Sequence, residues 1–119
     1  MLIMYFINMS IEQKEWHNMT DAERQEKRET ARVLGRATVQ TRDAKLDAHK
    51  NMTNAARRLS TAEKGLQHNP PKGSRDDCDA KKRELDSLRS AHDDATMAFN
   101  DATMALNEFR RKYPFVYDV

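Results

Sequence analysis

The side chains of this 119-residue chain that could take part in acid–base or metal chemistry are four histidines and one cysteine. The histidines are His17, His49, His68 and His92. They form no HxxxH pair, and no carboxylate-x-x-His motif recurs as a bundled two-metal site would require. His92 falls in an apolar row that His49 could approach from a second helix. We interpret this as a partly buried polar pair rather than a catalytic or metal site.

Cys78 has no second cysteine to pair with, which favours a reducing compartment and a cytoplasmic location in a bacterial or other host cell. It lies near an expected helix start with Lys81 and Lys82 one turn on, features that can activate a thiol, but the sequence places no base beside it. The acidic residues around it, 76–79, are typical of a first helical turn. The three glycines are isolated, so no phosphate-binding loop is present. We therefore predict no catalytic, cofactor-binding or metal-binding residues, and no enzyme.

Residues 94–107 read DATMAFN DATMALN, one seven-residue unit written twice. Seven residues make two helical turns, so Phe99 and Leu106 lie in one row, as in a helix that packs lengthwise on another helix. Met97 and Met104 point almost opposite to that row. If the Phe99–Leu106 row packs inward, both methionines face outward, and flexible methionines suit adaptable protein contacts. The alternative is a further packed helix that covers them.

Charged residues are segregated along the chain. A basic outer row is expected at Arg36, Lys50, Arg57 and Lys64, interrupted by Asp43. Two acidic outer rows follow later in the chain: Asp79, Asp86 and Asp93 in one, and Asp94, Asp101 and Glu108 in the other. The rows are read either as solvated faces or as complementary surfaces for self-association.

These rows also suggest two functions that involve nucleic acid. The basic row could bind nucleic acid, but no aromatic residues interleave with its cations for base stacking. The acidic row could inhibit a nucleic-acid-binding protein, although a net charge of +2 argues against mimicry by the whole molecule.

The elements that must position these residues are helices, because the chain has fourteen alanines and only three glycines and three prolines. Capping boxes are expected at Ser10–Gln13, Thr20–Glu23 and Ser74–Asp77. Gly35 is the weak point, where a kink or break is expected. The predicted order within a single domain 1–119 is an apolar segment 1–9, a short helix 11–18, a long helix 21–67, a loop 68–74, a long helix 75–112 and an apolar tail 113–119.

A short loop between two long helices predicts an all-α antiparallel hairpin with an alanine-rich seam. The apolar tail and the N-terminal segment are expected to cover each other at its open end as a small strand pair. The segment MLIMYFINM is too short to cross a bilayer and lacks the features of a signal peptide, so no membrane partner is expected.

Leu, Ile, Val and Phe together number only 19 residues, so a lone hairpin buries little apolar surface and self-association is expected. The predicted function is a non-catalytic protein–protein interaction protein, such as a small adaptor, inhibitor or assembly factor. Its partners would be a second copy and another protein. Size and simplicity would suit a phage or mobile-element accessory protein. The predicted contact residues are Met97, Met104, Asp94, Asp101 and Glu108.

Overall fold

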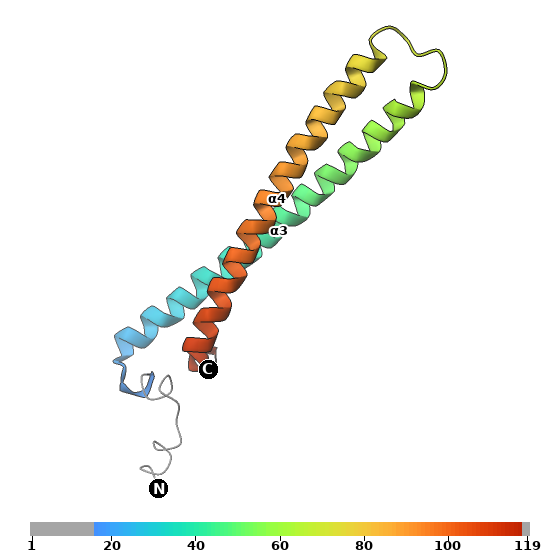
Figure 1. Ribbon diagram of the computed structural model, residues 1–119. Coiled ribbons are helices and arrows are strands. Elements are labelled where there is room, and N and C mark those ends of the chain that lie inside the picture. The colour runs from blue at the N-terminus through green and yellow to red at the C-terminus, as the bar shows by residue number, and fades with distance from the viewer. Residues whose placement is uncertain (1–15, 118–119) are drawn as a thin grey trace. The chain divides into compact units, whose positions relative to one another are not determined.

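The computed structural model describes residues 16–117, and most of them lie in two long helices. Helix α3 spans Asp21–Gly65, helix α4 spans Ser74–Lys112, and a short 3-10 helix, η1, spans Pro114–Tyr117 (Figure 1). Residues 16–18 are also helical, and no strand occurs between residues 16 and 117. The predicted all-α helical hairpin is confirmed, whereas its oligomeric state stays a prediction. The apolar segment 1–9 and residues 11–15 of the expected short helix lie outside the described residues.

Helix α3 begins where its local sequence predicts. The Thr20 hydroxyl oxygen accepts a hydrogen bond from the Glu23 backbone N–H at 3.2 Å, as in the predicted capping box. Asp21 and Glu23 place negative charge at the positive end of the helix dipole. The helix continues through Gly35, so the expected break does not occur. It ends at Gly65, two residues earlier than predicted.

Helix α4 begins differently from the expectation. The Ser74 hydroxyl donates to the Pro71 carbonyl at 2.7 Å instead of accepting from Asp77. The Asp77 N–H donates to the Gly73 carbonyl at 3.0 Å, so the first helical bond starts one residue earlier. Gly73 has a φ of +90°, a conformation that glycine adopts readily, which explains why the turn before α4 uses this residue. The predicted Ser74–Asp77 box is therefore wrong, whereas the end of α4 at Lys112 is the predicted one.

The described residues belong to two compact units, through both of which α3 and α4 run. Unit 1 contains residues 16–39 and 100–117, and unit 2 contains residues 40–99. The single domain expected from the sequence stays a prediction.

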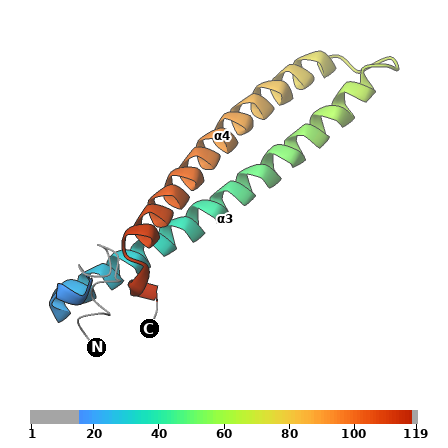
Figure 2. The same ribbon diagram turned by 60° about the horizontal axis from the view of Figure 1, so that its bottom comes forward.

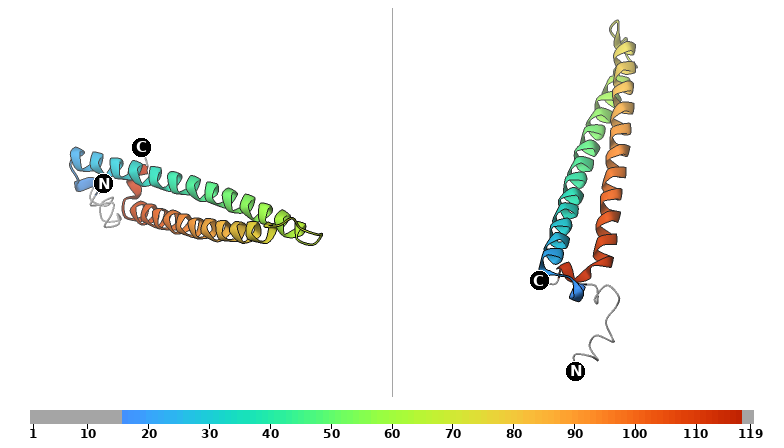
Figure 3. Two further views of the ribbon diagram at one scale, coloured as in Figure 1. Left: turned by 90° about the horizontal axis from the view of Figure 1, so that it is seen from above. Right: turned by 90° about the vertical axis from the view of Figure 1, so that its left-hand side faces the viewer.

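Unit 1 has an apolar core of Trp16, Ala31 and Val116, which are at most 8% exposed. Partly buried Met19, Phe109, Tyr113 and Phe115 pack against this core. Figure 3 shows η1 beside the short segment that leads into α3. The tail therefore covers Trp16 as a 3-10 helix, and the expected strand is wrong for residues 114–117. Pro114 ends α4 because its ring cannot continue the helical hydrogen bonds.

Unit 2 is the antiparallel pair formed by residues 40–65 of α3 and 74–99 of α4, joined by the loop (Figure 2). Its most buried residues are Ala55, Cys78 and Leu85, each 2–4% exposed. A methyl side chain at position 55 lets the two backbones approach closely. The guanidinium of Arg58 contacts the carboxylate of Glu84 across the seam at 3.1 Å. This contact places both side chains on one flank of the helix pair.

Among residues 16–117, no helix has both the length and the apolar character needed to cross a membrane. The predicted cytoplasmic location stays a prediction.

Candidate protein-interaction surface

Met97 and Met104 are among the most exposed large apolar side chains, at 64% and 60%. In the same repeat, Leu106 is 7% exposed and Phe99 is half-buried. The prediction that the Phe99–Leu106 row packs inward and both methionines face outward is confirmed. No described element covers the two methionines, in contrast to the alternative of a further packed helix.

Carboxylates flank these methionines along α4. Asp94, Asp101 and Glu108 are all exposed, and none of them forms an ion pair with a residue between 16 and 117. In unit 1, Met104 and Glu108 line one shallow pocket of about 320 Å³ together with Asn107 and Arg111. In unit 2, Asp94 and Met97 are three residues apart and so are neighbours on the helix surface. The structure therefore places apolar and acidic groups side by side, as predicted.

The predicted basic row is exposed at all four positions but is divided between the two units. In unit 1, the Arg36 guanidinium lies 3.8 Å from the Glu29 carboxylate, which offsets part of its charge. Lys50, Arg57 and Lys64 belong to unit 2, and no ion pair joins them to a residue of the described range. Arg57 lines a pocket.

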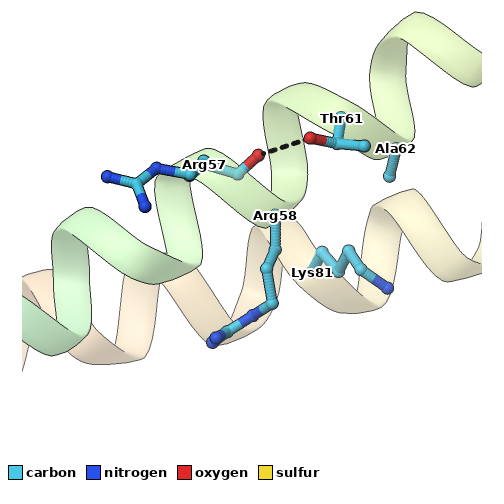
Figure 4. A pocket seen from close by; sticks show the side chains of 5 residues that line it. All are labelled: Arg57, Arg58, Thr61, Ala62 and Lys81. Carbon is cyan, nitrogen blue, oxygen red and sulfur yellow. Dashed lines mark hydrogen bonds between the residues drawn. The ribbon is translucent and has the colours of Figure 1, made fainter.

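That pocket lies between the two helices of unit 2 and has a volume of about 360 Å³. Its lining residues are Arg57, Arg58, Thr61, Ala62 and Lys81 (Figure 4). Figure 4 shows the three cationic groups pointing in different directions, so they do not converge on one point as a phosphate site would require. Their carbon stems, with the Ala62 methyl, form an apolar floor inside a cationic rim.

Helix geometry relates this pocket to Met97. Arg58 marks the flank on which Glu84 lies. Ala91 and Ala98 follow Glu84 at intervals of seven residues, so they continue along nearly the same flank of α4. Asp94 is one turn before Ala98, and Met97 is beside Asp94. Met97, however, lies 16 residues after Lys81, which is about 160° around the axis of α4, so Met97 and the pocket face different sides of unit 2.

Three of the residues singled out for chemistry, His49, His92 and Cys78, lie at the seam of unit 2. The rings of His49 and His92 lie with centroids 5.6 Å apart, which confirms the predicted pair across the seam. Cys78 is 2% exposed, so its thiol is inaccessible. Asp77 pairs with Lys81 at 2.8 Å in the first turns of α4. Between residues 16 and 117, no three His, Cys, Asp or Glu side chains gather as metal ligands.

Sequence reasoning missed several surface residues. Val33, Val39 and Leu46 of α3 are large apolar side chains that are 47–59% exposed. Val39 and Leu46 are seven residues apart on α3, the same signal that singled out the two methionines. Arg58 and Lys81 were not assigned to a site, because the pocket forms only when their stems meet across two helices.

Comparison of the chain with protein-family models, curated proteins and solved structures finds no match.

Proposed function

We propose that this protein is a non-catalytic protein-binding hairpin whose contact surface is the Met97–Met104 face of α4. The observation that carries the proposal is the pair of methionines, each at least 60% exposed, beside carboxylates without ion-pair partners in the described range. Fully burying a methionine side chain contributes about 1.5–3 kcal/mol. Unpaired carboxylates beside it favour a partner that presents cations around an apolar recess.

A second copy of this chain offers such a surface. The pocket bounded by Arg57, Arg58 and Lys81 has an apolar floor and a cationic rim, the complement of a methionine beside a carboxylate. A flexible thioether adapts well to an irregular apolar recess. The chemistry of the two surfaces therefore supports self-association in which Met97 of one copy enters the pocket of the other.

The positions of Met97 and the pocket on unit 2 decide how the copies are arranged. Lys81 and Met97 are separated by 16 positions on one helix, which corresponds to about 24 Å along its axis. The pocket of a copy and its own Met97 therefore engage different neighbours, which gives a head-to-tail contact.

The test is the double variant Met97→Asp with Met104→Asp, studied by light scattering behind size exclusion over a range of protein concentrations. We expect the variant to keep the helical circular dichroism of the wild type but to elute with the mass of a monomer. The matched control is Val39→Asp with Leu46→Asp, which places the same charges on exposed apolar positions of α3. If the α4 variant associates as the wild type does, or if both variants lose association equally, the proposed surface is wrong.

Nucleic-acid binding by the basic row receives less support. Arg36 is paired with Glu29, and the cations around the pocket diverge. A gel shift at low salt with micromolar protein tests this alternative. A complex that is lost in the variant Lys50→Glu with Arg57→Glu would favour it over self-association.

A further inference from the structure

His49 of α3 and His92 of α4 lie on opposite sides of the seam in unit 2. Their ring centroids are 5.6 Å apart, with 52° between the ring planes. His49 is exposed and His92 is half-buried, so solvent reaches the pair from the side of His49. The two side chains come from positions 43 residues apart in the sequence, and only the pairing of the helices brings them together.

This separation suits two imidazoles that share one metal ion. Zinc binds histidine nitrogen at about 2.0–2.1 Å, and the ring centroid lies about 1 Å behind that nitrogen. Two such ligands at a tetrahedral or slightly wider angle have centroids about 5 to 5.5 Å apart. The observed 5.6 Å is close to this separation, and rotation of the exposed His49 side chain sets the direction of its nitrogens.

The surroundings leave the ring nitrogens available. The His92 backbone carbonyl accepts a hydrogen bond from the Thr96 hydroxyl at 2.8 Å. Within residues 16–117, no hydrogen bond engages the ring of His49 or of His92. Lys45, one turn before His49, places its ammonium 5.2 Å from the Phe99 ring. Arg89, three residues before His92, lies 3.7 Å from the Asp86 carboxylate. Both nearby cations thus have other contacts.

We propose that His49 and His92 form an interhelical site for a borderline divalent transition-metal ion such as Zn²⁺ or Ni²⁺. Neutral imidazole is a preferred ligand of these ions, whereas Mg²⁺ prefers oxygen. The two histidines supply half of a tetrahedral shell, and water completes it. Because the ligands come from α3 and α4, the ion fastens the two helices together and stabilises the folded state.

The test is the thermal midpoint of the full chain, followed by circular dichroism, with Zn²⁺, Ni²⁺ or Mg²⁺ added at increasing concentration. We expect Zn²⁺ and Ni²⁺ to raise the midpoint by several degrees and Mg²⁺ to leave it unchanged. His49→Ala, at an exposed position that should not impair folding, is expected to abolish the shift. His68→Ala, in the loop, serves as the matched control and should retain it.

A wild-type midpoint that does not respond to millimolar Zn²⁺ or Ni²⁺ would overturn the site. So would a shift that persists in His49→Ala, since the ion would then be bound elsewhere. The same titration in the variant Met97→Asp with Met104→Asp separates this site from the proposed function. A retained shift in that variant shows that the two histidines of one chain suffice.

Discussion

At the scale of single residues, Arg24 has a role that its position in the sequence does not reveal. Its Nε donates to the Trp16 carbonyl and its Nη2 to the His17 carbonyl, each at 3.1 Å. These carbonyls belong to the last helical residues before α3, and the Trp16 carbonyl also accepts a hydrogen bond from the Met19 N–H at 3.3 Å. The guanidinium carbon also lies 5.5 Å from the centre of the Trp16 ring. One side chain therefore holds the entering segment against the core of unit 1.

We expect Arg24→Ala to loosen Trp16 and to lower the free energy of unfolding of unit 1 by about 1–2 kcal/mol, because two charge-assisted hydrogen bonds are lost. Trp16 is the single tryptophan, so its fluorescence reports on this core alone. The emission should shift to longer wavelength, and its urea midpoint should fall. Arg32→Ala is the control, since Arg32 contacts only exposed Glu29 at 2.7 Å and should matter little. Unchanged emission in Arg24→Ala would contradict this role.

At the scale of elements, replacing glycine by alanine is expected to have opposite effects on stability in the helix and in the turn. Gly35 lies inside α3, and a Cβ built there meets no atom within 4 Å. Gly73 also has open space around it, but its φ of +90° is a conformation that residues with side chains rarely adopt. Available space therefore does not decide the effect of adding a methyl group, whereas backbone conformation does.

Gly35→Ala should raise the free energy of unfolding by about 0.5–1 kcal/mol, because alanine restricts the unfolded chain and favours helix. Gly73→Ala should lower it by about 1–2 kcal/mol, because alanine is strained at that positive φ. Urea unfolding followed by circular dichroism at 222 nm measures both changes. Movement of the two midpoints in the same direction would show that the backbone argument fails.

At the scale of the whole molecule, the proposed self-association depends on complementary charges as well as on methionine burial. Arg57 lies at the rim of the pocket and Asp94 lies beside Met97. Neither forms an ion pair with another residue of the described range. In a head-to-tail contact, Arg57 of one copy faces Asp94 of the next copy, so reversing one of these charges makes the contact repulsive.

A charge exchange tests this arrangement. Arg57→Glu alone and Asp94→Arg alone should each associate several-fold more weakly than the wild type, since like charges then face each other. An equimolar mixture of the two variants should recover association, because every contact between one variant and the other pairs opposite charges. Analytical ultracentrifugation with one variant labelled by a fluorophore measures the mixed species. If the mixture associates no better than the separate variants, these two residues do not meet.

The amino-acid sequence by itself determined the elements of this protein and the outward direction of its methionines. The signals for these elements are local, because each acts over a few residues of chain. They are the apolar spacing, the Thr20–Glu23 cap, the two prolines of the loop and Pro114. They predicted both long helices to within two residues at every end. The seven-residue repeat likewise placed Met97 and Met104 opposite the buried row.

Only the tertiary structure decided which side chains from distant positions meet. Three features join segments that are far apart in the chain. They are the pocket at Arg58 and Lys81, the contact of Arg58 with Glu84, and the packing of η1 over Trp16. The exposure of Val39 and Leu46 was decided in the same way, since it depends on the rotation of α3 against its neighbour. Helical periodicity gives a residue's direction about its own axis, whereas the register and rotation between two helices arise from packing of their whole contact faces.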